Sequence, residues 1–150
     1  MRLECERCRR PEYLNSKPCA EALVVRDGSV LLVKRNIEPF RGYWDIPGGF
    51  LEDGEQPEDG VRREVLEEAG LDVRVLSLLG VYGEAYPGPE KINTLTFTYI
   101  AEPLGEPKAL DESEEVRFFP VDRIPERLAF DHARRAIGDW QRLVRTDPAG

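Results

Sequence analysis

The chain has 150 residues, of which 41% are hydrophobic and 33% charged, a composition typical of a globular domain with one substantial core. Its net charge of −8 argues against non-specific binding to DNA or RNA, because the phosphate backbone attracts basic surfaces. No stretch reaches the roughly 18–20 apolar residues of a membrane span. The charged N-terminus, with Arg2, Glu4, Glu6 and Arg7, is unlike a secretory signal, so a cytoplasmic location is expected.

Extended segments make up most of the predicted secondary structure. Runs rich in β-branched and aromatic residues favour strands, and Asp27-Gly28 is a hairpin turn signal. Residues 1–18 predict an irregular arm, and residues 19–150 predict a single domain. Loops are expected at 37–43, 83–91 and 103–113, and strands at 20–26, 30–34, 44–47, 71–82, 92–101 and 116–119.

Two helices are expected. The first begins near Pro57, a residue favoured in a first helical turn, and stops at Gly70. The second spans residues 129–144, where apolar residues recur at helical spacing and indicate packing. Those residues are Phe130, Ala133, Ile137, Trp140 and Val144. The order of β-hairpin, helix, strands and helix favours an α+β sandwich.

The first helix carries an acidic face. Glu64, Glu67 and Glu68 fall within an arc of roughly 100°. Each such pair of like charges destabilises an isolated helix by about 0.2–0.5 kcal/mol. A hard divalent cation such as Mg²⁺ or Mn²⁺ would offset the repulsion. The alternative is a solvated acidic face without a metal.

Residues 49–71 resemble the signature of the Nudix hydrolases. That signature is Gly, five residues, Glu, seven residues, then Arg-Glu-aliphatic-x-Glu-Glu-x-Gly-aliphatic. The matching positions are Gly49, Glu55, Arg63, Glu64, Val65, Glu67, Glu68, Gly70 and Leu71. The resemblance implies the Nudix fold, an α/β/α sandwich with a mixed β-sheet, in agreement with the α+β order of the elements.

The resemblance also implies an activity: hydrolysis of the pyrophosphate bond of a nucleoside diphosphate linked to another moiety, with Mg²⁺ or Mn²⁺ as cofactor. Phosphoryl transfer depends on charge neutralisation and alignment more than on covalent catalysis. The implied metal ligands are Glu64, Glu67, Glu68 and the carbonyl of Gly48. Arg63 would orient a glutamate, and Glu55 would support the loop or reach the metal through water; the alternative is a surface ion pair between them.

The general base is expected outside this segment, on a loop before a late strand, as in several Nudix proteins. Glu112, Glu114 and Glu115 occupy such a position. Glu115 is taken as the catalytic candidate, with Glu114 also plausible. The alternative is that all three are solvated loop charges.

Further segments resemble the Nudix branch that carries an N-terminal zinc ribbon, whose characterised members hydrolyse ADP-ribose, FAD or NADH. The segments are Lys34-Arg35-Asn36-Ile37-Glu38-Pro39, Gly42-Tyr43-Trp44, Pro47-Gly48-Gly49 and Leu128-Ala129-Phe130. The Ser-Gln-Pro-Trp motif of the NADH-specific group is absent, so ADP-ribose or a dinucleotide such as FAD is the expected substrate. Tyr86 and Pro87 occur together where one or the other marks dinucleoside polyphosphate and ADP-ribose enzymes, and do not discriminate.

Substrate contacts are expected from loop residues. Tyr43 and Tyr86 are candidates to stack on a base, as is Phe40, and Arg35 or Arg41 could pair with phosphate. Packing is the alternative role of Tyr43, and His132 is expected to be structural rather than catalytic.

Cys5 and Cys8 form a Cys-x-x-Cys pair before Tyr13-Leu14-Asn15-Ser16-Lys17-Pro18, which resembles the second half of the zinc ribbon. One knuckle cannot complete a four-ligand site, although Cys19 could add a third ligand. No stable zinc is expected at Cys5 and Cys8.

The expected partner is a small nucleotide substrate, with no nucleic acid and no membrane, and a homodimer is one expected state because many Nudix proteins dimerise. Three other functions stay open: a nucleoside triphosphate pyrophosphatase for nucleotide sanitation, a non-catalytic nucleotide sensor, and a zinc-binding interaction module.

Overall fold

The computed structural model describes residues 1–110 and 113–147. Its helices are α1 (Pro57–Ala69) and α2 (Asp131–Thr146). Its strands are β1 (Arg2–Glu4), β2 (Pro11–Tyr13), β3 (Lys17–Arg26), β4 (Ser29–Arg35), β5 (Trp44–Asp45), β6 (Gly48–Phe50), β7 (Val73–Ala85), β8 (Asn93–Pro103) and β9 (Ser113–Pro120). In these described residues, neither helix has both the length and the apolar composition needed to cross a bilayer.

A seven-stranded mixed sheet forms the centre of the fold. Its main path runs β5-β4-β3-β8-β7, with β6 added on β3 and β9 on β4. The β3–β8 pair is parallel and the other pairs are antiparallel. This arrangement confirms the expected α+β class with a mixed sheet.

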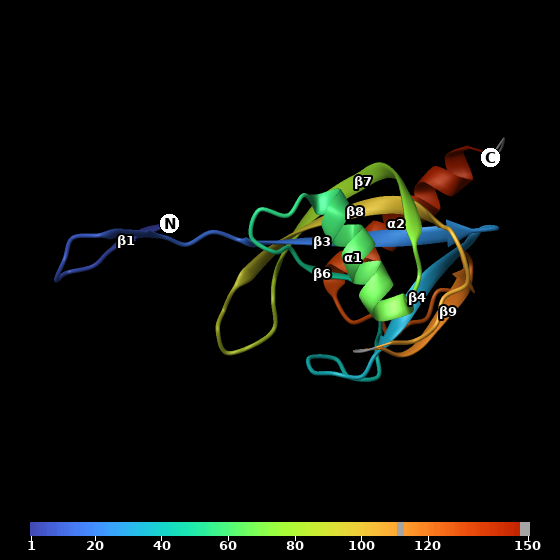
Figure 1. Cartoon of the computed structure of the whole chain (residues 1–150), viewed down its shortest axis with the longest axis horizontal. Helices are drawn as coiled ribbons and strands as arrows, with labels where there is room; N and C mark the ends of the chain where they lie inside the picture. The colour runs from blue at the N-terminus through green and yellow to red at the C-terminus, as the bar shows by residue number, and fades with distance from the viewer. Residues whose placement is uncertain (111–112, 148–150) are drawn as a thin grey trace.

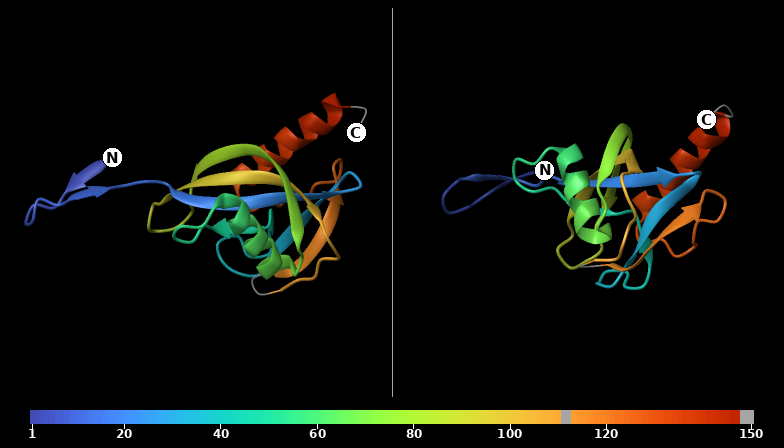
Figure 2. Two further views of the ribbon diagram at one scale, coloured as in Figure 1. Left: turned by 45° about the horizontal axis from the view of Figure 1, so that its top comes forward. Right: turned by 45° about the vertical axis from the view of Figure 1, so that its right-hand side comes forward.

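The two helices cover opposite faces of the sheet (Figures 1 and 2). Alternation along β3 explains why, since successive side chains of a strand point to opposite faces. Ala20, Ala22 and Val24 belong to the core cluster that contains the buried face of α1. Leu23, between them in sequence, belongs to the cluster that contains the buried face of α2. Each face therefore has its own apolar core, and β3 contributes to both.

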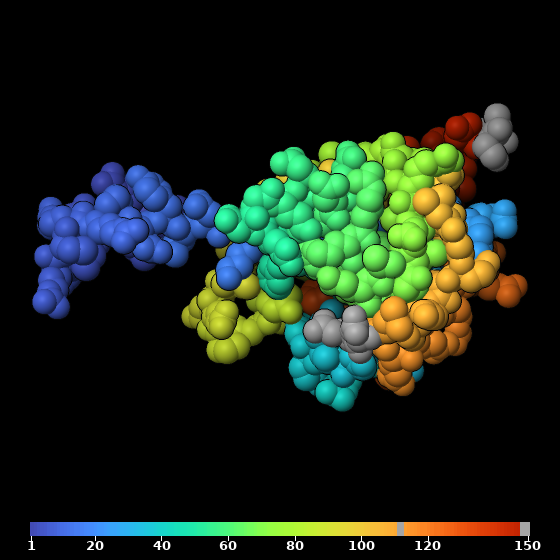
Figure 3. Space-filling model, viewed as in Figure 1, coloured from blue at the N-terminus to red at the C-terminus, as the bar shows by residue number. Residues whose placement is uncertain are grey.

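The prediction that the N-terminal arm is irregular is wrong. β1 and β2 form a two-stranded hairpin in which Arg2 pairs with Tyr13, and it projects away from the body (Figure 3). All residues of both strands are exposed. Without a buried face, the segment lacks the alternation from which a strand is recognised.

Strand boundaries also differ from the sequence prediction, and β3, for example, begins at Lys17, within the predicted arm. β7 continues to Ala85, into the predicted loop, because its pairing with β8 extends to Asn93. β9 begins at Ser113 rather than at residue 116, since it pairs with β4 from Arg35 onward. The residues expected as a turn at Gly48-Gly49 form β6, which pairs with β3. In each case the partner strand is distant in sequence, so a local pattern does not report the pairing.

Candidate active site

Helix α1 turns part of its acidic face, Glu64 and Glu68, toward a cavity, and both residues are half-buried. Pro57 opens the helix and Gly70 closes it in the left-handed conformation, φ 55°, with its N–H donating to the carbonyl of Leu66. Val61 and Val65 are fully buried against the sheet. This packing fixes the rotation of the helix, so Glu64 and Glu68 face a cavity beside β3 and β6.

Two glycines of β6 allow the backbone to pass between α1 and β3. A Cβ on Gly49 would lie 2.6 Å from Oε1 of Glu64, and one on Gly48 would lie 2.4 Å from Cβ of Glu21. No side chain fits at either position. The absence of side chains on the Gly-Gly pair therefore lets the backbone of β6 approach the carboxylate of Glu64.

Arg63 ties the loop before α1 to the acidic face. Its Nε donates to Glu55 at 2.7 Å, and one terminal nitrogen donates to Glu64 at 2.7 Å and Glu67 at 3.3 Å. The other terminal nitrogen donates to Glu55 at 2.9 Å and to the carbonyl of Phe50 at 3.1 Å. A planar guanidinium with several fixed donors can hold these groups together. The structure thus brings Glu55, Arg63 and Glu64 into one network.

The cavity has a volume of about 380 Å³, within the range of small-molecule sites. One part of its wall is acidic and another is aromatic. The acidic side chains are Glu21, Asp45, Glu64, Glu68 and Glu84, and the aromatic ones are Phe50, Tyr86, Phe130 and His132.

Negative charge is concentrated at the acidic wall. Burial raises the pKa of Glu68 well above its usual range, and the charges of Asp45 and Glu64 raise it further, against a hydrogen bond from the Gly48 backbone. Burial also raises the pKa of Glu64, although Arg63 opposes the shift. Buried carboxylates that repel one another are the oxygen donor set that a divalent cation stabilises. The residues present therefore fit the Mg²⁺ or Mn²⁺ expected from the sequence.

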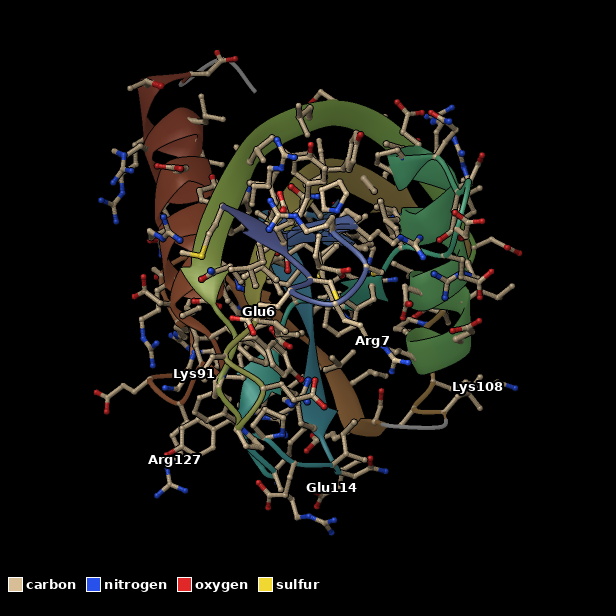
Figure 4. All side chains as sticks on the ribbon, turned by 90° about the vertical axis from the view of Figure 1, so that its left-hand side faces the viewer. Glu6, Arg7, Lys91, Lys108, Glu114 and Arg127 are labelled. Atoms are coloured by element: carbon tan, nitrogen blue, oxygen red, sulfur yellow. The ribbon has the colours of Figure 1, made fainter. Side chains whose placement is uncertain are left out.

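The other expected glutamates lie elsewhere. Glu67 is half exposed, 50% for its side chain, and does not line the cavity. Glu115 lies in β9 and binds Arg117, and Glu114 pairs with Lys34 at 3.7 Å. Figure 4 shows Glu114 at the periphery of the molecule. Glu112 lies outside the described residues. The structure does not bring Glu114 or Glu115 to the acidic wall, and the role of Glu115 as general base stays a prediction.

Of the five candidate substrate contacts, Arg35 and Tyr86 line the cavity, and Phe40, Arg41 and Tyr43 do not. Arg35 is held there by the carbonyl of Pro39 at 2.8 Å and by Asp45 at 3.4 Å. Tyr86 stacks on Phe130, with ring centroids 5.7 Å apart. Tyr43 lies outside this cavity, against Phe40 at 5.7 Å.

Sequence reasoning did not place four ionisable residues at the cavity, Glu21, Asp45, Glu84 and His132. His132 was expected to be structural, yet it lines the cavity with Nε2 2.8 Å from Glu21 and Nδ1 2.7 Å from Glu84. Burial alone would lower the pKa of His132, but the charge and hydrogen bonds of these glutamates raise it to about 10. The one local signal was Glu21, a charged residue within the apolar run of β3.

The cysteines do not come together. Cys5 and Cys8 are exposed in the projecting hairpin, whereas Cys19 lines the cavity, where burial raises the pKa of its thiol to about 12. The backbone N–H groups of Cys8 and Arg7 hydrogen-bond to the sulfur of Cys5 and lower its pKa. Cys19 is therefore not placed as a third ligand for the hairpin pair.

A mixed sheet lies between two helices, and carboxylates and aromatic rings line one cavity beside it. The chain belongs to the Nudix family, since the NUDIX domain model matches residues 17–141. It is therefore an enzyme of the Nudix pyrophosphohydrolase type.

Two curated proteins are similar to this chain in sequence. The ADP-ribose pyrophosphatase of Methanocaldococcus jannaschii is 39% identical over 131 residues, which cover 87% of this chain and 76% of that protein. The NAD-capped RNA hydrolase NudC of Salmonella typhi is 30% identical over 145 residues, 95% of this chain and 54% of that protein. The chain thus spans about half the length of NudC.

Solved structures agree with the fold. A NUDIX hydrolase from Nitrosomonas europaea superposes with a TM-score of 0.82 and 31% identity, covering 97% of this chain and 81% of that one. The MutT NUDIX hydrolase of Burkholderia pseudomallei gives a TM-score of 0.75 and 30% identity, covering 83% of this chain and 98% of that one.

Proposed function

We propose that the chain hydrolyses the pyrophosphate bond of ADP-ribose or of a related dinucleotide such as FAD. The observation that carries the proposal is that Glu64 and Glu68 line the same cavity as Tyr86 and Phe130. A substrate with a diphosphate beside an aromatic base needs both kinds of wall. The 39% identity to the ADP-ribose pyrophosphatase of Methanocaldococcus jannaschii supports this substrate class.

Glu64, Glu68 and the carbonyl of Gly48 would hold the divalent cation, with Glu67 at the outer side of the same helix face. When bound, such a cation neutralises phosphate oxygens and lowers the pKa of its bound water. Arg63 positions Glu64 and shields part of its charge. Its hydrogen bonds to Glu55 and to the carbonyl of Phe50 hold the loop between β6 and α1 against the helix.

The aromatic wall would bind the base. Tyr86 lies between Phe50 and Phe130, each with its ring centroid 5.7 Å away. Arg35 would pair with a phosphate or ribose oxygen, since its guanidinium lies in the cavity wall over the ring of Phe130 at 5.2 Å. Stacking on Tyr86 and the guanidinium of Arg35 would orient the substrate so that its diphosphate lies beside the carboxylates and their cation.

NudC suggests a second candidate substrate, a nucleotide-capped RNA end. The net charge of −8 opposes binding of the RNA body, so the prediction of no nucleic-acid partner is retained.

A homodimer also stays a proposal.

The test is a hydrolysis screen with Mg²⁺ and with Mn²⁺ over ADP-ribose, FAD, NADH, diadenosine polyphosphates, nucleoside triphosphates and NAD-capped RNA. Products are separated by chromatography. AMP with ribose 5-phosphate, or AMP with FMN, supports the proposal. Pyrophosphate released from triphosphates moves the assignment to nucleotide sanitation, and binding without turnover of any substrate indicates a nucleotide sensor.

A further inference from the structure

A second group of potential metal ligands lines the same cavity as Glu64 and Glu68 of α1. Glu21, Asp45 and His132 are all buried, and each offers one ligand atom within 4.8 Å of the others. They come from β3, β5 and α2. Elements far apart in the chain thus place one imidazole and two carboxylates around a single point.

Glu84 orients the imidazole of this group. Its Oε1 lies 2.7 Å from Nδ1 of His132, and its Oε2 accepts the backbone N–H of the same residue at 3.2 Å. The ring of His132 also stacks on Phe130, with centroids 5.5 Å apart. A carboxylate bound to one ring nitrogen is the usual partner of a metal-binding histidine, because it fixes the ring and directs the other nitrogen to the metal.

The spacing of the three ligand atoms suits one ion. Bonds of about 2.0–2.2 Å place neighbouring ligand atoms of an ion about 3.0 Å apart and opposite ones about 4.2 Å apart. Nε2 of His132 lies 2.8 Å from Oε2 of Glu21, and no pair in the group exceeds 4.8 Å. Small side-chain rotations would therefore complete the coordination.

The charges around the point favour a cation. Glu21 and Asp45 are 3% and 8% exposed. Their nearest positive groups are His132 and the guanidinium of Arg35, 3.4 Å from Asp45. The hydroxyl of Thr98 donates to the other oxygen of Glu21 at 2.6 Å and so directs Oε2 toward His132. Binding of a cation would release the Nε2 proton of His132 to solvent and leave its Nδ1 proton on the bond to Glu84.

We propose that Glu21, Asp45 and His132 bind a transition-series divalent cation such as Zn²⁺, Co²⁺ or Mn²⁺, at a site separate from the carboxylates of α1, with Glu84 orienting His132. Imidazole nitrogen selects such ions over Mg²⁺ and Ca²⁺, which prefer oxygen alone. This inference is independent of the substrate proposed above. It assigns the cavity a second ion, held by an imidazole nitrogen as well as by carboxylate oxygens.

Cobalt titration of tag-free protein tests the site. The chain contains one histidine, so any imidazole signature arises from His132. A Glu64→Gln/Glu68→Gln double variant removes the two carboxylates of α1 that line the cavity while keeping the shapes of their side chains. In that variant we expect one bound Co²⁺ by calorimetry, and a paramagnetically shifted, exchangeable imidazole N–H signal by proton NMR.

Three further changes are made in the same background. His132→Gln should abolish the shifted signal and weaken Co²⁺ binding more than tenfold. Asp45→Asn should also weaken binding, and it replaces the His132 variant in the test if that variant does not fold. Glu84→Gln should weaken binding about tenfold without changing the stoichiometry. Glu106→Gln, on the exposed loop after β8, is the matched control and should bind normally.

Co²⁺ binding without an imidazole signal, or unchanged binding in the His132→Gln and Asp45→Asn variants, would overturn the site. Absence of Co²⁺ binding would do the same. Failure of the hydrolysis screen with this signature intact would overturn the proposed substrate and leave the metal site standing.

Discussion

Arg63 and Glu55 form a two-point ion pair, in which Nε and one terminal nitrogen of the arginine lie 2.7 and 2.9 Å from the two carboxylate oxygens. The third guanidinium nitrogen is thereby left to face Glu64, at 2.7 Å. The pair joins the loop before α1 to the carboxylate that borders the cavity. Its geometry gives Glu55 a structural effect on a site that it does not itself line.

Glu55 should titrate at unusually low pH. Hydrogen bonds from Arg63, and then the backbone N–H of Glu52, lower the pKa of Glu55 from 4.5 to about 2. Because the folded-state pKa is the lower one, the pair stabilises the fold above pH 4.5, and this contribution is lost as the pH falls toward 2. Carboxyl ¹³C NMR should give a midpoint near 2. The difference in unfolding free energy between wild type and Glu55→Gln should shrink over the same interval; a constant difference would contradict the assignment.

Arg63→Lys should lower kcat by about 10- to 100-fold with little change in KM. Lysine keeps the charge but has one ammonium group, which cannot hold Glu55, Glu64 and the carbonyl of Phe50 together. The control is Arg62→Lys on the next residue, whose side chain pairs with Asp59 on the exposed side of α1. Steady-state kinetics on both variants measures the effect, and equal losses would argue against a special role for the guanidinium.

The glutamates of α1 should differ in importance. Glu64→Gln and Glu68→Gln should each lose about 100-fold or more in kcat/KM at saturating Mg²⁺, because both side chains line the cavity. Glu67→Gln should lose less than about tenfold, since its side chain is half exposed. Glu58→Gln, exposed on the same helix and paired with Arg62, is the control. A larger loss at Glu67 than at Glu64 would reverse the order of the metal ligands.

Gly49→Ala should raise the Mg²⁺ concentration needed for half-maximal activity by about tenfold. The added methyl group would lie 2.6 Å from Oε1 of Glu64 and would displace that carboxylate. The matched change Gly138→Ala in α2 meets only Arg142, at 3.8 Å. It should raise the unfolding free energy by about 0.5–1 kcal/mol, because Gly is unfavourable within a helix, without a change in metal dependence. Unchanged Mg²⁺ dependence in Gly49→Ala would show that Glu64 is not held by the close approach of β6.

Tyr86→Ala should raise KM for ADP-ribose with kcat retained. Base–aromatic stacking is worth about 1–3 kcal/mol, which corresponds to roughly 5- to 150-fold in affinity. Tyr86→Phe keeps the ring and should keep KM, and Tyr13→Ala, on the projecting hairpin, should leave both constants unchanged. An unaltered KM in Tyr86→Ala would assign Tyr86 to packing between Phe50 and Phe130.

The sequence by itself determined helix α1 and the family. Pro57 and Gly70 mark the ends of α1, and the spacing of Glu64, Glu67 and Glu68 reports one helix face, because these features depend on residues a few positions apart. The central strands β3 and β4 were also evident, because their consecutive buried residues form apolar runs. The exposed hairpin β1–β2 has no buried face and was missed.

Only the tertiary structure decided which polar groups share the cavity. Glu21, Asp45, Glu84 and His132 come from β3, β5, β7 and α2, and their meeting depends on strand register and on the packing of α2. The tertiary structure also places Glu64, Glu68 and Tyr86 at the cavity and leaves Glu67 and Tyr43 outside it. The sequence analysis had no basis for that distinction. The physical reason is that a local pattern reports which face of one segment is buried, whereas the side chains that meet depend on pairing between segments distant in sequence.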